Sequence, residues 1–222
     1  MKTRQVALIL YLIACSLSVL ASIIDNELLM LISKPAIIPA IIYYYLTIKK
    51  SSVEPVYIAV LLFNFVGDTI ALLRFENQTL LLMIPFFMSY VLILRCIIID
   101  VLKLKWDRTG GFIAVAIFLF LMYVLSELIG MFADTNPELV WPVIIYGIFL
   151  GGLSSLSVYC YATKISVHAF FMLMFVLTSV VSDVFYMLFE FIYKISFLNY
   201  FEFAAQLFSY YFLVKYFVLR SK

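Results

Sequence analysis

The strongest constraint on this chain is a series of long apolar runs with only short polar connections between them. A helix needs about 20 mainly apolar residues to cross the hydrocarbon core of a bilayer. Polar and turn-forming residues divide the sequence into eight such runs, at 5–24, 28–48, 53–73, 79–99, 111–132, 139–160, 167–190 and 197–219. Continuous runs exclude barrel strands, which would alternate. We therefore predict an all-α polytopic membrane bundle of eight transmembrane helices, forming a single integral membrane domain over 1–222.

The composition supports this class. Of the 222 residues, 66% are hydrophobic and 13% are charged, whereas soluble domains are about half apolar and about a quarter charged. The net charge of +2 gives no basis for nucleic-acid binding, so the lipid bilayer is the expected partner. Cys15, Cys96 and Cys160 lie in apolar runs without a C-x-x-C spacing. We expect neither a disulfide framework nor a metal site, and no cofactor.

Basic residues orient the helices. Ten of them fall on one side of the predicted membrane, and only Arg74 and Lys194 fall on the other. Basic residues concentrate in cytoplasmic loops, so both termini are predicted to face the cytoplasm, in a cytoplasmic (inner) membrane. The ten are Lys2, Arg4, Lys49, Lys50, Lys103, Lys105, Arg108, Lys164, Arg220 and Lys222.

Two features of the sequence have competing interpretations. Leu12 to Cys15, after Lys2 and Arg4, resembles a lipoprotein signal, but the apolar run continues to Ile24 as in a retained helix. The two halves of the chain also share faint patterns, Pro35-Ala-Ile-Ile with Pro142-Val-Ile-Ile and Val66-Gly-Asp with Val181-Ser-Asp. These patterns fit a parallel repeat of four plus four helices, or chance similarity among apolar residues.

Seven ionisable residues interrupt the predicted spans. Each costs about 2.5–3.5 kcal/mol at a helix centre, so an intramembrane charge is read first as functional or paired. Arg95 and Lys215 are near inner helix ends, where long side chains reach the headgroups. The other five share one layer in the outer half: Lys34, Asp68, Glu127, Asp183 and Glu202. Asp68 and Asp183 are the deepest acids. Glu127 and Glu202 also fit an interpretation as acids at the membrane interface.

Polar neighbours lie one helical turn from these charges, on the same helix face. Asn64 precedes Asp68 by four residues, and Tyr123 precedes Glu127 by four. In the seventh helix, Ser179, Asp183 and Tyr186 form a polar stripe. Tyr90 and Tyr146 are expected to reach the same layer or slightly deeper. Pro35 and Pro39 are expected to kink the second helix beside Lys34 and to free carbonyl groups, whereas His168 is expected to be interfacial.

These positions resemble the YhhN-like membrane family, which includes the lysoplasmalogenases and has eight helices. The resemblance rests on Lys34-Pro35, Gly67-Asp68, Ser182-Asp183, Tyr146 after Pro142, and Tyr210-Tyr211. The chain departs from the family pattern in three places. Ser89-Tyr90 stands where a histidine is common, Phe175-Val176 replaces a small Gly-Ala pair, and Lys215 replaces a glutamine.

The resemblance implies hydrolysis of the vinyl ether bond of a lysoplasmalogen-like lysolipid to a fatty aldehyde and a glycerophospho-alcohol. Protonation of the enol-ether carbon gives an oxocarbenium ion that water attacks, which requires a neutral acid and an ionised partner. A low-dielectric site favours a neutral carboxyl, and a nearby cation favours an ionised one. We expect Asp68 and Asp183 to be this pair, either one being the acid, and Lys34 to contact an aspartate or a phosphate. Residues expected to support water or substrate are Asn64, Glu127, Tyr146, Ser182 and Tyr186.

Two other functions fit the same residues. A small proton-coupled transporter would use the aspartates to bind and release protons or a cationic solute. A catalytically inactive lipid-binding protein would retain the helices without the reaction. Replacing Asp68 or Asp183 with asparagine separates the three, because an enzyme loses turnover, a carrier loses proton coupling and a scaffold loses neither.

Overall fold

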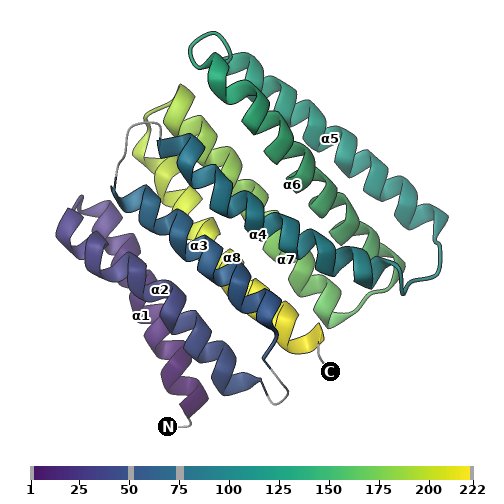
Figure 1. The fold of residues 1–222 in the computed structure, drawn as a ribbon, viewed down its shortest axis with the longest axis horizontal. Helices are drawn as coiled ribbons and strands as arrows, with labels where there is room; N and C mark the ends of the chain where they lie inside the picture. Colours follow the sequence, from purple (N-terminus) through teal and green to yellow (C-terminus); the bar gives the residue numbers. More distant parts are fainter. Residues whose placement is uncertain (1–2, 50–52, 74–77, 221–222) are drawn as a thin grey trace. The chain divides into compact units, whose positions relative to one another are not determined.

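The structure is a computed structural model that describes residues 3–49, 53–73 and 78–220. The described residues form eight α-helices, one short π-helical segment and no strand. Figure 1 labels α1 to α8. Their bounds are α1 Thr3–Ile23, α2 Glu27–Ile48, α3 Pro55–Leu73, α4 Gln78–Val101, α5 Arg108–Phe132, α6 Pro137–Thr163, α7 Val167–Met187, the π-helical segment Leu188–Ile192, and α8 Ser196–Arg220.

Each predicted apolar run corresponds to one helix, with ends that shift by a few residues. Seven helices are long and apolar enough to cross a membrane, and the exception is α8. This helix has 25 residues, but its mean hydropathy is lower because it includes charged residues such as Glu202, Lys215 and Arg220. Four basic residues used to orient the chain, Lys2, Lys50, Arg74 and Lys222, lie outside the described residues.

The chain forms two compact units. The first comprises residues 1–89 and 213–222, and the second comprises residues 90–212. The boundaries fall inside α4 and α8, so each of these helices contributes to both units. The single-domain organisation stays a prediction.

The first unit is built on a hairpin of α1 and α2, which lie side by side (Figure 1). Asp25, in the connection, has a φ of 52°, a left-handed conformation that aspartate tolerates better than most residues. The Asn26 side chain then caps α2 by accepting a hydrogen bond from the Leu29 N–H. Pro35 and Pro39 lie inside α2, which stays one continuous α-helix across both.

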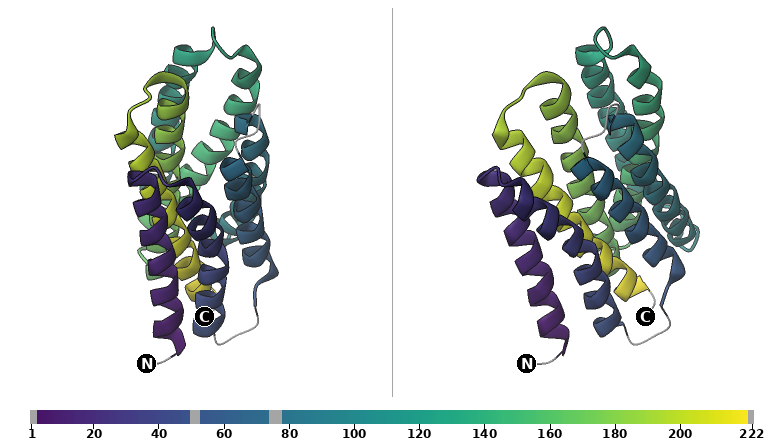
Figure 2. Two further views of the ribbon diagram at one scale, coloured as in Figure 1. Left: turned by 90° about the vertical axis from the view of Figure 1, so that its left-hand side faces the viewer. Right: turned by 60° about the vertical axis from the view of Figure 1, so that its left-hand side comes forward.

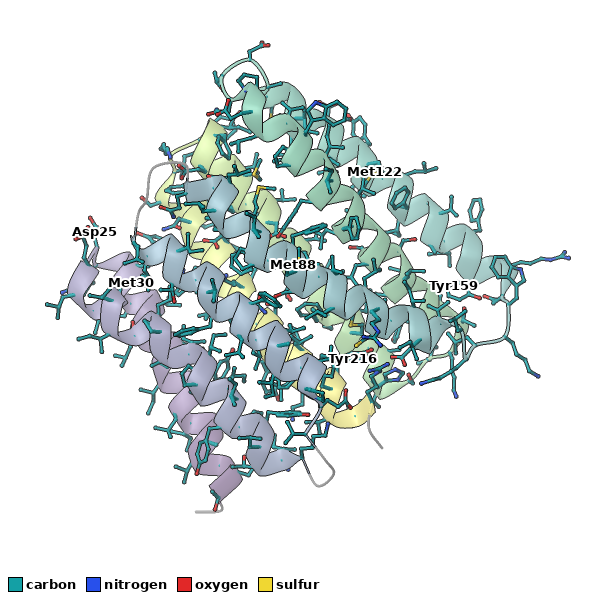
Figure 3. All side chains as sticks on the ribbon, viewed as in Figure 1. Asp25, Met30, Met88, Met122, Tyr159 and Tyr216 are labelled. Carbon is teal, nitrogen blue, oxygen red and sulfur yellow. The ribbon has the colours of Figure 1, made fainter. Side chains whose placement is uncertain are left out.

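The second unit contains a matching hairpin of α5 and α6, which run antiparallel side by side in both views of Figure 2. Asp107 caps α5 by accepting a hydrogen bond from the Gly110 N–H at 2.6 Å. Gly151 lies against α5, because a Cβ there would be 2.6 Å from the terminal methyl group of Met122. Met122 is labelled between α5 and α6 in Figure 3.

Candidate functional site

One polar cluster of the second unit surrounds Asp183 on α7. Its Oδ2 accepts a hydrogen bond from the Tyr90 hydroxyl of α4 at 2.9 Å and another from the Tyr146 hydroxyl of α6 at 2.9 Å. The two phenol rings are 5.5 Å apart between centroids and tilted by 59°. Three helices thus place two phenol donors on one carboxylate oxygen, and we call these three residues the Asp183 cluster.

The local sequence of α7 explains why Asp183 meets α4 and α6. Ser179, Ser182 and Asp183 recur at intervals of three and four residues, which puts them on one face of the helix. Ser179 and Ser182 are buried, so this face is turned toward the interior of the unit. Ser179 satisfies its hydroxyl by donating to the Phe175 carbonyl at 3.0 Å. Of the stripe predicted from the sequence, Ser179 is buried, and Asp183 and Tyr186 are half-buried.

The two carboxylate oxygens of Asp183 differ in the hydrogen bonds that they accept from Tyr90 and Tyr146. Oδ2 receives both phenol hydrogens, and Oδ1 receives none of the hydrogen bonds from Tyr90 and Tyr146. Hydrogen bonds to an ionisable acceptor fix its orientation and are stronger than those between neutral groups. Tyr90 is buried, whereas Asp183 and Tyr146 are only half-buried. A carboxyl group held in this way can exchange a proton through Oδ1 without losing its two donors.

The first unit contains a separate ion pair. Lys34 Nζ on α2 lies 3.8 Å from Asp68 Oδ1 on α3, and their side chains are 13% and 5% exposed. Asn64, one turn before Asp68, is also buried. Asp68 and Asp183 belong to different units, so the pairing of these two aspartates stays a prediction. Lys34 therefore lies beside Asp68, one of the two aspartates considered.

Gly67, next to Asp68, lets α3 approach α4 closely. A Cβ at this position would lie 2.8 Å from two atoms of the Phe86 ring. A rigid aromatic ring cannot move its edge aside as a flexible side chain can, so overpacking here costs about 1–3 kcal/mol. We expect Gly67→Ala to lower the melting temperature of the purified protein. Gly152→Ala is the matched control, because its Cβ would meet no atom within 4 Å among the described residues.

Other predicted residues are less closely associated with these contacts. Glu127 is exposed on α5, which favours its interpretation as an interfacial acid. Glu202 and Tyr186 are half-buried, and Ser182 is buried beside Asp183 in the sequence. Arg95 is exposed, whereas Lys215 lies 5.7 Å from the Tyr44 ring centre and is half-buried.

Sequence reasoning missed a polar cluster at the other end of the second unit. Asp100, at the end of α4, is 9% exposed, and its Oδ2 lies 3.6 Å from His168 Nε2. Its Oδ1 lies 3.4 Å from Lys103 Nζ, while His168 Nδ1 is 3.0 Å from the Ser166 hydroxyl. The predicted span ended at residue 99, so Asp100 counted as part of a connection. The Asp100-x-x-Lys103 spacing was the available signal, since it matches an i,i+3 pair.

A second missed network lies where α2 ends. Lys49 Nζ contacts the Tyr45 hydroxyl at 2.6 Å and Glu54 Oε1 at 3.3 Å. Glu54 Oε2 lies 3.7 Å from Arg220 Nη1, which connects the end of α8 to α2 and α3 within the first unit. The Lys49 side chain is only 2% exposed. Such a pairing between distant parts of the sequence has no signature in local spacing.

Neither a metal-binding group in the described part of the chain nor a match to a known protein adds to the features of the site. Within the described residues, no group of three histidine, cysteine, aspartate or glutamate side chains is placed to hold a metal ion. No protein-family model, no curated protein and no solved structure matches the chain. The YhhN-like resemblance therefore rests only on the short motifs given above.

Proposed function

We propose that this protein is a multi-pass membrane hydrolase that cleaves the vinyl ether bond of lysoplasmalogen-like lysolipids. The observation that supports the proposal is the Asp183 cluster, in which Tyr90 and Tyr146 both donate to Oδ2. Vinyl ether hydrolysis needs a carboxyl group that delivers a proton in a fixed direction. The substrate class comes from the resemblance of the motifs around Lys34, Asp68 and Asp183 to the YhhN-like family.

In the proposed mechanism, Asp183 Oδ1 delivers a proton to the carbon of the enol ether that is remote from oxygen. The adjacent carbon becomes part of an oxocarbenium ion, and water adds to it while a carboxylate takes the proton of that water. The hemiacetal then collapses to a fatty aldehyde and a glycerophospho-alcohol. One water is consumed, and the acid is restored when a proton returns to Asp183.

Asp68 is assigned the second carboxylate role, as an ionised group paired with Lys34. A lysolipid phosphate would compete for Lys34, because an ammonium binds phosphate as a point charge. We assign the positioning of water or substrate to Asn64, Ser182 and Tyr186. Glu127 is exposed, which favours a place at the membrane interface over this role. These roles predict that Asp68→Asn also lowers turnover.

The proposed topology has eight spans, with α8 as the eighth. α8 is as long as the other helices, and partners within the first unit reduce the cost of its charges, since Arg220 lies near Glu54 and Lys215 near Tyr44. The basic connections and both termini would then face the cytoplasm in an inner membrane. The parallel four-plus-four repeat stays a prediction.

The test of the proposed reaction is aldehyde release by the purified protein in detergent. Three lysolipids that share headgroup and chain length would be compared: a 1-alkenyl ether, a 1-alkyl ether and a 1-acyl ester. Only the alkenyl ether can be protonated on carbon, so it alone should yield an aldehyde. Cleavage of the acyl ester alone would contradict the proposed chemistry.

Removal of a single phenol hydroxyl has a predictable effect. Tyr146→Phe deletes one of two hydrogen bonds to Asp183 and keeps the ring that lies against Tyr90. A hydrogen bond to a charged group contributes about 1.5–3 kcal/mol, so turnover should fall roughly 10- to 100-fold. Steady-state aldehyde release measures this effect, and Tyr161→Phe, on α6 but outside the cluster, is the control. A Tyr146→Phe variant with full turnover would remove Tyr146 from the mechanism.

A proton-coupled carrier is the second candidate, and the Lys34–Asp68 pair is the observation that favours it. Proton binding to Asp68 would disrupt this ion pair, which joins α3 to Lys34 of α2, the helix that contains Pro35 and Pro39. Proteoliposomes with an internal pH dye separate the two candidates. A carrier acidifies the lumen on solute addition and loses this response in Asp68→Asn, whereas a hydrolase releases aldehyde without a pH gradient.

A further inference from the structure

One end of the second unit carries a basic and apolar surface formed by two connections. The α4–α5 connection and the α6–α7 connection lie at the same end of α5 and α6 (Figure 1). Direct contacts join them: the Asp107 N–H donates to the Tyr159 hydroxyl at 3.2 Å, and the rings of Trp106 and Tyr159 are 6.1 Å apart. Tyr159 is labelled at this end in Figure 3. We call this surface the basic rim and define it by residues 102–108 and 164–167.

The basic rim carries more positive charge than its acids can neutralise. Lys105, Arg108 and Lys164 are exposed, and within the described part of the chain none of them forms an ion pair with a carboxylate. The two acids near the basic rim already have other partners. Asp100 lies within ion-pair distance of Lys103 and near His168, and the Asp107 side chain caps α5. Three cations thus remain available to an anionic partner.

Exposed apolar side chains alternate with these cations. Leu102, Trp106 and Ile165 are 78%, 79% and 79% exposed. Indole rings favour the headgroup level of a bilayer, where their apolar faces meet acyl chains and their N–H groups meet water. An acidic protein or a nucleic acid would bind the cations but would leave these apolar groups in water. A lipid would bind the cations through its headgroup and the apolar side chains through its acyl chains.

We infer that the basic rim binds the headgroups of anionic glycerophospholipids. Lys105, Arg108 and Lys164 would contact the phosphate and other anionic oxygens, while Trp106, Leu102 and Ile165 enter the upper acyl-chain region. The protein would therefore be surrounded at this end by a shell enriched in anionic lipid. This binding is independent of the Asp183 cluster and holds whether or not the protein is a hydrolase.

The two tryptophans of the chain provide a direct test. Trp106 is on the basic rim, and Trp141 is near the opposite end of α6, exposed and close in sequence to the acidic Asp134 and Glu138. Trp141→Phe leaves Trp106 as the only reporter, and Trp106→Phe leaves Trp141. Each variant is reconstituted into phosphatidylcholine vesicles in which an equal mole fraction of lipid is brominated phosphatidylglycerol or brominated phosphatidylcholine. Bromine quenches tryptophan fluorescence only at short range, so quenching reports the local lipid.

We expect phosphatidylglycerol to associate with the Trp106 reporter at least about fivefold more strongly than phosphatidylcholine at low salt, since each basic residue that contacts the headgroup contributes roughly that factor. High salt should reduce the preference, and Lys105→Gln/Arg108→Gln/Lys164→Gln should abolish it. Lys194→Gln, near the other end of α7, should leave it unchanged. The Trp141 reporter should show no preference. Equal quenching by both lipids at Trp106, or a preference that survives the triple substitution, would overturn the inference.

Discussion

Asp183→Asn is expected to reduce aldehyde release from a vinyl-ether lysolipid by about 10²–10⁴-fold, the range that a positioned general acid contributes. The amide is nearly isosteric with the carboxyl group and still accepts a hydrogen bond from Tyr90 or Tyr146 through its oxygen. It cannot deliver a proton to carbon. The effect should therefore appear in kcat, with little change in KM, because ground-state binding of the lipid is retained.

Two controls separate this result from misfolding. The melting temperature of Asp183→Asn should stay within a few degrees of the wild type, since no charge is added and the side-chain volume is preserved. Asp134→Asn removes a carboxylate from a connection of the same unit and should retain full turnover. A folded Asp183→Asn variant with wild-type kcat would show that another group supplies the proton.

Lys34→Met is expected to have the largest effect on stability, a loss of about 3–5 kcal/mol. The Asp68 side chain is only 5% exposed, and the substitution leaves it without the ammonium that lies 3.8 Å away. Removing one partner of a buried ion pair costs far more than the attraction of the pair provides. The measurement is thermal or denaturant unfolding in detergent micelles.

Two further variants test whether the lost stability arises from the ion pair. Lys34→Met/Asp68→Leu removes both charges and should recover most of the lost stability, because an apolar pair satisfies a buried site as well as an ion pair does. Arg95→Met also deletes a cation from a span, but Arg95 is exposed, so the change should be below about 1 kcal/mol. If the double variant is as unstable as Lys34→Met, the cost arises from lost packing and the ion pair is not its cause.

The helices could be predicted from the sequence because apolar length is a local property. A run such as 139–160 needs no tertiary information, and the structure extends it only to Pro137–Thr163. Helix ends were less predictable, since caps such as Asp107 belong to the connections that the hydropathy rule leaves out. This omission is also why the buried Asp100 was missed.

The candidate site was predictable only in part. Asp183 and Tyr146 were identified by intramembrane polarity and by motif, and in the structure a hydrogen bond joins them. Tyr90 stands where the YhhN-like family, which the short motifs resemble, commonly has a histidine, and it was expected only to reach the layer. Its hydroxyl donates to the same oxygen, a fact that depends on how α4 packs against α7. Glu127 shares the depth of the other acids, but depth does not determine which way a helix faces, and its side chain is exposed.

The measurement that tests the central claim most directly is hydrolysis of the vinyl-ether lysolipid in D₂O, with the aldehyde trapped as a hydrazone as it forms. Proton delivery to carbon by Asp183 predicts one deuterium on the carbon next to the carbonyl group. It also predicts a slower reaction than in H₂O, because proton transfer limits the rate, and loss of both signals in Asp183→Asn. Aldehyde without deuterium at that carbon, or no aldehyde from the folded wild-type protein, would contradict the account.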